Sequence, residues 1–143
     1  MRENYRDRAV VIRTYDFGEA DRVIVLLTRD HGLVRAVAKG VRRAKSRFGS
    51  RLQLFVNLDV QLYVGKNLAT ISQADTVDYF GARLIEDYER YTAACAVLES
   101  AERLAFADAA HDPYLYESVT ATLEQLQTCL LYTSPSPRDG LLS

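Results

Sequence analysis

The densest group of chemically active side chains in this sequence is a basic segment between residues 39 and 51. It carries no acid and six cations, at Lys39, Arg42, Arg43, Lys45, Arg47 and Arg51. Nucleic-acid phosphates need cations spaced along a groove, and arginine and lysine contact phosphates without reading base sequence. Most runs of like charge are simply solvated surface. Whether this segment binds nucleic acid therefore depends on the strand or loop in which it lies.

Three aromatic residues are candidate partners for bases, which stack on flat apolar side chains. Phe55 and Tyr63 fall on the polar side of an alternating segment. Tyr15 points outward if Val10 and Ile12 of its strand face inward. The alternative is that these rings pack under a second layer of structure, and we expect packing to be the commoner outcome.

Catalytic chemistry finds little support in the sequence. The two histidines, His31 and His111, fall in a hairpin turn and in a break between helices, where a solvated loop residue is the usual outcome. No nucleophile elbow or phosphate-binding loop is present. We therefore expect no catalytic residues and no enzymatic activity.

Metal binding is also poorly supported. Asp16, Glu19 and Asp21 form an acidic cluster that could hold a divalent ion, but such a cluster is more often a solvated turn. Cys95 and Cys129 lie far apart and lack the paired spacing of a zinc site. The sequence thus predicts no metal, no cofactor and no disulfide scaffold.

Composition indicates a folded domain with uneven charge. The chain has 143 residues, 48% of them apolar and 26% charged. No apolar run approaches the roughly 18 residues of a membrane span, and no export signal is recognisable, so we expect a cytoplasmic protein. Residues 1–80 hold 14 Lys and Arg against 9 Asp and Glu, net +5, and residues 81–143 hold 4 against 10, net −6. A basic first part favours a polyanionic partner.

Period-two patterns and turn residues predict five short strands in the first 80 residues. The expected strands are 9–15, 22–28, 33–39, 54–64 and 68–74. Five strands with an insertion after the third are typical of an OB-fold barrel, with an SH3-like barrel as the structural rival. We expect residues 1–80 to form an OB-fold nucleic-acid-binding domain.

The basic segment extends directly from the third expected strand. In an OB-fold, strands two and three with their loops build the nucleic-acid face. Arg35 and Lys39 alternate with Ala36 and Ala38, so both cations point outward if the alanines pack inward. Phe48, together with Leu52 nearby, is expected to close the end of the barrel.

A helical period replaces the strand period after residue 83. One helix of about 24 residues is predicted from an apolar stripe at Leu84, Tyr88, Tyr91, Cys95, Leu98, Ala101 and Ala105. A break at 109–113 precedes a second helix over 114–127, with Pro113 near its start. Two such helices do not close a bundle, so residues 81–128 are expected to be a truncated helical domain whose stripe is left uncovered.

The last 15 residues share no period with the rest of the chain. The string CLLYTSPSPRDGLLS can be back-translated into codons resembling a transposase sequencing adapter read as coding sequence. We expect residues 129–143 to be a non-native tail. Different codons in the nucleotide record would rule this out.

The stretch from Val11 to Phe55 resembles the N-terminal region of the bacterial recombination mediator family RecO. The motifs GEADR, LVRAVAKG and KSRFG occur in order, and the resemblance continues through LDVQLY and the helix at 88–98, covering roughly residues 5–127. It implies an OB-fold followed by a helical domain that binds single- and double-stranded DNA. It further implies annealing of complementary strands and, with RecR, loading of the recombinase RecA onto strands coated by single-strand binding protein.

The resemblance implies that full-length members continue into further helical residues, which carry a docking pocket for single-strand binding protein and sometimes a four-cysteine zinc site, and we expect this chain to be truncated before them. Neither feature maps onto residues here, and we expect DNA binding without recombinase loading from these residues alone. Two other functions stay open: a protein-interaction barrel that docks an acidic partner, and an RNA-binding OB domain.

Overall fold

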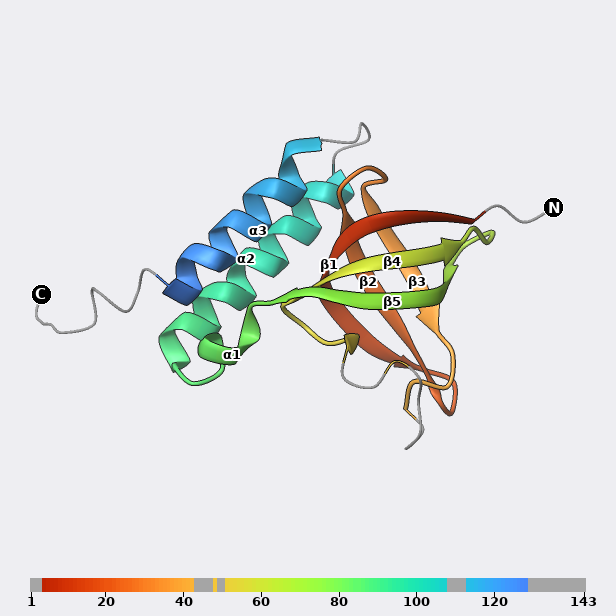
Figure 1. Cartoon of the computed structure of the whole chain (residues 1–143), viewed down its shortest axis with the longest axis horizontal. Helices are drawn as coiled ribbons and strands as arrows, with labels where there is room; N and C mark the ends of the chain where they lie inside the picture. The colour runs from red at the N-terminus through yellow and green to blue at the C-terminus, as the bar shows by residue number, and fades with distance from the viewer. Residues whose placement is uncertain (1–3, 43–47, 49–50, 108–112, 129–143) are drawn as a thin grey trace, which may run out of the picture.

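Five strands rich in β-branched residues are followed by three helices in the part of the chain that the structure describes, which is residues 4–42, 48, 51–107 and 113–128 of the computed structural model. The strands are β1 (Asn4–Phe17), β2 (Asp21–Thr28), β3 (Leu33–Ala38), β4 (Val56–Tyr63) and β5 (Ala69–Tyr79). The helices are α1 (Gly81–Leu84), α2 (Tyr88–Ala107) and α3 (Pro113–Thr128) (Figure 1).

The strands close into a barrel in the order β1-β2-β3-β5-β4. Neighbouring strands are antiparallel except β3 and β5, which pair in parallel through Ala36 with Ala69 and Val37 with Thr70. The crossover that puts β5 rather than β4 beside β3 gives the Greek-key order of an OB-fold. The predicted OB-fold is therefore confirmed.

Two strands are longer than their sequence patterns predict. β1 begins at Asn4, because its polar N-terminal half pairs with β4 and its C-terminal half pairs with β2. β5 runs on to Tyr79, which pairs with Val56. In both cases backbone pairing extends a strand through polar residues that show no apolar alternation.

The barrel strands bury apolar side chains on two sides. One cluster fills the barrel interior and includes Ala9, Val11, Ile24, Leu58 and Ile71. A second cluster lies between barrel and helices, and it takes Val10 and Ile12 from β1. Because both faces are buried, the middle of β1 is a continuous apolar run rather than an alternating one. The condition attached to the outward direction of Tyr15, that Val10 and Ile12 face inward, is therefore not met in the barrel interior, although Tyr15 itself is exposed.

Phe48 and Leu52 both belong to the barrel interior, where each is about 3% exposed. Their burial agrees with an inward position, and that they close the barrel end stays a prediction.

The long first helix predicted from residue 83 is interrupted. α1 ends at Leu84 and α2 begins at Tyr88, and the Asp87 carboxylate accepts hydrogen bonds from the backbone N–H groups of Glu89 at 3.0 Å and Arg90 at 3.4 Å. Aspartate is a preferred helix N-cap because it satisfies such free N–H groups. The second predicted helix is confirmed, with Pro113 as its first residue.

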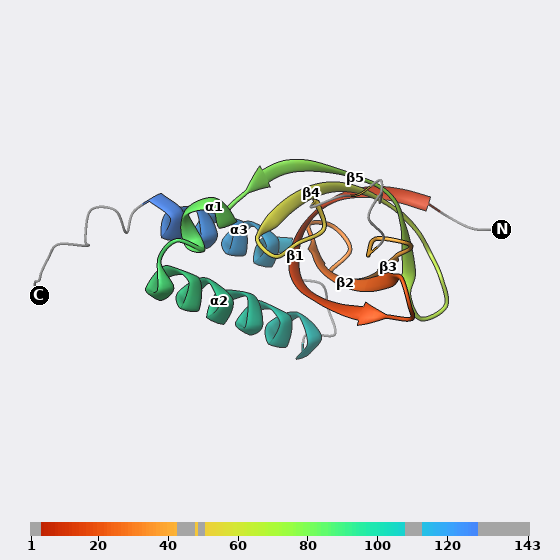
Figure 2. The ribbon, with the colours of Figure 1, turned by 90° about the horizontal axis from the view of Figure 1, so that it is seen from below.

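The apolar stripe of the helices is covered in part. α2 and α3 lie side by side along one side of the barrel (Figure 2). Leu84 and Leu98 are buried against the barrel strands and α3, whereas Tyr88 is 82% exposed and lies off the buried face. The expectation of an uncovered stripe is wrong for Leu84 and Leu98, because the outer side of the barrel supplies an apolar surface against which they pack, and it holds for Tyr88.

One buried hydrogen bond joins α3 to the barrel, and it provides a test of the packing. The Tyr116 hydroxyl donates to Asn57 Oδ1 at 2.8 Å. We expect Tyr116→Phe to lower the free energy of unfolding by about 1–3 kcal/mol, because the buried Asn57 oxygen loses its partner. Urea denaturation measures the change, with Tyr88→Phe on the exposed surface as the matched control. An equal effect of both variants would contradict this role.

The same hydroxyl makes a pH-dependent contribution. Burial raises the pKa of Tyr116 above its ordinary value of 10.0. Its contribution to stability is therefore fully present below pH 10.0 and is lost as the pH rises through the folded-state pKa. Unfolding measured on both sides of pH 10 should show a smaller alkaline loss of stability in Tyr116→Phe than in the native chain.

Candidate nucleic-acid interface

Strands β1, β2 and β3 present their outer sides next to one another. Their register forms two rows, Arg13–Val25–Arg35 and Tyr15–Val23–Val37. Residues directly opposite one another on paired strands point to the same side of the sheet. Along one strand, every second residue points to that side. Phe17 and Lys39 follow at the strand ends. We call the exposed members of this set, Arg13, Tyr15, Phe17, Arg35 and Lys39, the open face.

The open face has an apolar floor between its charged and aromatic groups. Val23 and Val37 are buried, whereas Tyr15 is 37% and Phe17 45% exposed. A guanidinium lies over one of these rings, with Arg13 Cζ 5.4 Å from the Tyr15 centroid. Aromatic rings that are accessible beside cations are the combination that binds single-stranded nucleic acid, through base stacking and phosphate contacts.

Arg35 and Lys39 occupy the positions expected from the sequence. Ala36 and Ala38 pack into the barrel interior, and the two cations are exposed. Neither forms an ion pair with another residue in the described ranges. Both are therefore available to a phosphate on the same surface as Tyr15.

The helical layer sets the limit of the open face. Val25 and Leu27 of β2 are buried under the helices, and Arg13 Nη1 lies 3.1 Å from Glu102 Oε2 of α2. Arg13 thus sits on the boundary, between an acidic helix and the exposed Tyr15 ring. The sequence did not indicate Arg13 or Phe17, because strand register and helix packing decide their neighbours.

The basic segment is anchored where it leaves β3. The Arg42 backbone N–H donates to Ala20 O at 2.9 Å, and its guanidinium donates to Gly18 O at 3.3 Å. Gly18 has a φ of 65°, which a side chain would oppose. The start of the basic segment therefore rests on the β1–β2 turn, residues 18–20.

The acidic cluster supports this anchoring. Asp21 Oδ1 accepts a hydrogen bond from the Gly40 backbone N–H at 2.7 Å, and Asp16 pairs with Arg22 and Arg42. Glu19 is exposed. The described residues contain no group of acidic, histidine or cysteine side chains placed to hold a metal ion.

The rest of the basic segment is only partly described. Arg43, Lys45 and Arg47 lie outside the described residues, so their role stays a prediction. Arg51 is exposed and donates from Nη1 to Ala74 O on β5 at 3.2 Å. The described ends of the segment thus rest on the β1–β2 turn and on β5.

Two of the three predicted stacking aromatics lie away from the open face. Phe55 is 2% exposed and packs edge-on against Tyr91, with ring centroids 5.8 Å apart. Its stacking role is corrected, because both sides of the ring are covered under the helical layer. Tyr63 is half-buried and pairs with Asn4, at the opposite end of β1 from Tyr15. Only Tyr15 joins the cations.

His31 has a more specific environment than a solvated turn. Its Nδ1 lies 2.7 Å from Oδ2 of the buried Asp7, and its ring centroid is 4.1 Å from that of Tyr5. The Asp7 carboxylate also accepts the backbone N–H of Asp30 at 3.1 Å. These contacts hold the β2–β3 turn against β1, away from the open face.

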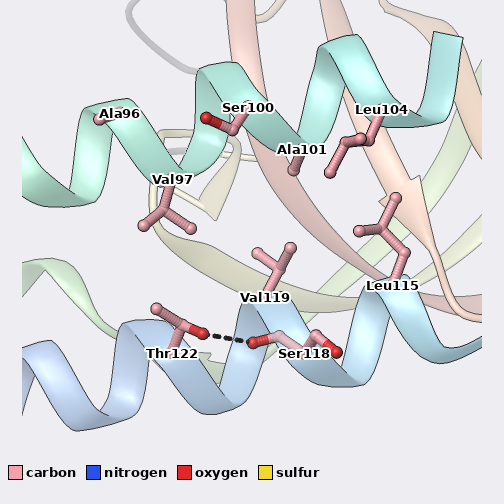
Figure 3. Close-up of a pocket in the computed structure, with 9 residues that line it drawn as sticks. All are labelled: Ala96, Val97, Ser100, Ala101, Leu104, Leu115, Ser118, Val119 and Thr122. Atoms are coloured by element: carbon pink, nitrogen blue, oxygen red, sulfur yellow. Dashed lines mark hydrogen bonds between the residues drawn. The ribbon is translucent and has the colours of Figure 1, made fainter. Parts of the chain in front are cut away.

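An apolar cavity of about 300 Å³ lies between α2 and α3 (Figure 3). Its lining includes Val97, Leu104, Leu115 and Val119, with hydroxyls but no charged side chain among the lining residues. It offers no acid, base or cation for chemistry. The exposed cations Arg35 and Lys39 and the exposed ring of Tyr15 lie on the barrel instead.

The strand order β1-β2-β3-β5-β4 places the chain among the OB-fold proteins. The family model described as Recombination protein O N terminal matches residues 1–80, more than half of the chain. The chain belongs to this family, whose role is in DNA repair and recombination, where its members act as recombination mediators. None of the helices in the described ranges is long and apolar enough to cross a membrane.

The two free cations provide a first test of the open face. We expect Arg35→Ala with Lys39→Ala to weaken binding of single-stranded DNA. If each contacts one phosphate, the slope of log K against log salt becomes shallower by about 0.7 for each residue removed. Fluorescence anisotropy at several salt concentrations measures both quantities. An unchanged affinity and slope would remove β3 from the interface.

Aromatic stacking is tested separately. We expect Tyr15→Ala to weaken binding by about 1–3 kcal/mol with little change in the salt slope, because stacking involves no counterion release. Tyr63→Ala is the comparison, since it tests the remaining stacking prediction at the other end of β1. If Tyr15→Ala lost thermal stability but bound single-stranded DNA with native affinity, Tyr15 would be a packing residue.

Proposed function

We propose that this chain binds single- and double-stranded DNA through the open face and the basic segment. The observation that carries the proposal is the juxtaposition, on one exposed surface of an OB barrel, of Tyr15 and Phe17 with Arg35 and Lys39. The cations neutralise phosphates and the rings stack on bases, so binding requires no particular sequence.

The charge distribution supports the same surface. Residues 1–80 carry a net charge of +5 and residues 81–143 a net charge of −6. An acidic helical layer repels a polyanion and the basic barrel attracts it. The expected path of a strand therefore runs over the barrel, from the open face toward residues 39–51, and away from α2 and α3.

DNA binding of this type suits a recombination mediator, whose role involves no catalytic turnover. We propose that the protein anneals complementary strands and, together with RecR, helps to load RecA onto strands coated by single-strand binding protein, in the cytoplasm. Support comes from membership of the family and from a binding surface that holds backbone and bases without reading sequence. An annealing assay with complementary oligonucleotides tests the first of these activities.

The decisive experiment compares three labelled probes: single-stranded DNA, RNA of the same sequence and an acidic peptide. We expect DNA to bind, with an affinity that falls as salt rises. Preference for the RNA would indicate an RNA-binding OB domain, and preference for the peptide would indicate a protein-interaction barrel.

The basic segment is tested with the same DNA probe. Arg42→Ala with Arg43→Ala is expected to weaken binding and to make the salt slope shallower by about 0.7 for each phosphate that the variant no longer neutralises. The barrel should remain folded, which thermal unfolding checks. Arg103→Ala on α2, exposed on the acidic half, is the matched control. A native affinity and slope in the double variant would exclude Arg42 and Arg43 from the interface.

A further inference from the structure

Two arginines from different segments meet at a single carboxylate beside the open face. Arg22 Nε of β2 lies 3.1 Å from Asp16 Oδ1, and Arg42 Nη2 of the basic segment lies 3.6 Å from Asp16 Oδ2. Each guanidinium therefore lies next to a different oxygen of the Asp16 carboxylate. The cluster holds two positive charges against one negative charge.

The arginine pair does not depend entirely on this carboxylate for its position. Arg42 also donates to Gly18 O at 3.3 Å, and its backbone N–H donates to Ala20 O at 2.9 Å. Arg22 extends from a strand held on both sides, where it pairs with Asp16 and with Ala38. The two guanidinium groups would thus stay near one another if the carboxylate were displaced.

The ion pairs are accessible to solvent. The side chains of Asp16, Arg22 and Arg42 are 59%, 43% and 34% exposed. Exposed ion pairs of this kind contribute little to stability and are weakened by salt. An anion from solution can therefore exchange with the Asp16 carboxylate at small cost to the fold.

A phosphodiester has the features that the Asp16 carboxylate supplies. It carries one negative charge and two terminal oxygens, and arginine pairs with both kinds of anion through charge-assisted hydrogen bonds. Strand alternation directs Asp16 to the opposite side from Tyr15, toward the end of the barrel where Arg42 contacts the β1–β2 turn. The cluster lies on the expected path of the DNA backbone.

We propose that Arg22 and Arg42 form a phosphodiester-binding site that the Asp16 carboxylate occupies when DNA is absent. This inference rests on the proposed DNA binding and adds Arg22 and an internal competitor to it. DNA binding displaces Asp16 from the two guanidinium groups. Asp16 therefore weakens the affinity of the two arginines for a phosphodiester.

The test compares two substitutions that each remove one negative charge from the same part of the barrel. Asp16→Asn removes the competitor, and we expect it to raise the affinity for labelled oligodeoxythymidine by about two- to fivefold, the range given by an exposed ion pair. Glu19→Gln is the matched control, because Glu19 is exposed three residues away and forms no ion pair with a described residue. Its effect should be smaller. In an Arg22→Ala, Arg42→Ala background, the two substitutions should act alike.

Equal gains from Asp16→Asn and Glu19→Gln in the native background would overturn the inference and leave DNA binding intact. A native chain that does not bind the oligonucleotide would overturn the proposed function and this inference together.

A second measurement uses the native chain and so does not depend on how the variants fold. The arginine Nε–H resonances are followed by NMR during titration with a thymidine dinucleotide, which contains one phosphodiester. We expect the Arg22 and Arg42 signals to move and the Arg6 signal to stay, because Arg6 is paired with Asp59 at 2.8 Å near the other end of β1. Equal movement of all three signals would contradict a specific site.

Discussion

The apolar contact between the outside of the barrel and the helical pair is the constraint on which the rest of this structure depends. Val10, Ile12 and Leu27 of the barrel are buried against α2 and α3. Burial of this kind is the main favourable contribution to folding. It also covers part of the outer side of β1–β3, and so determines which residues remain as the open face.

Phe55 shows how strongly this contact constrains the chain. Its φ of 70° lies in the left-handed region, which is unfavourable for a bulky side chain. The ring is buried beside Tyr91, and the carbonyl of Phe55 accepts the Phe80 backbone N–H at 2.8 Å. The residue that leads into β4 is thus joined to the residue that leads out of β5, and its burial offsets the backbone strain.

Ion pairs and hydrogen bonds, rather than apolar packing, organise the part of the barrel that the helices leave uncovered. Asp16 and Asp21 hold the start of the basic segment on the β1–β2 turn, through an ion pair with Arg42 and a hydrogen bond from Gly40. Arg35 and Lys39 remain without such partners among the described residues. The surface therefore combines cations that are already positioned with cations that are free, beside rings that are open to bases.

Local sequence pattern determined the OB-fold strands, the second helix and the outward direction of Arg35 and Lys39, because period-two alternation reports directly which side of a strand is buried. It also indicated that Phe48 belongs to the barrel core. It could not distinguish the two apolar environments of β1, since Val10 and Val11 are equally apolar and only the packed helices separate the inside of the barrel from the outside. For the same reason Phe55 and Tyr15 were equivalent candidates in the sequence, and tertiary packing buried one ring and left the other exposed. The contact of Asp16 with Arg42 and that of Arg13 with Glu102 were likewise decided by the tertiary structure, because loop and helix packing bring together charges that are far apart along the chain.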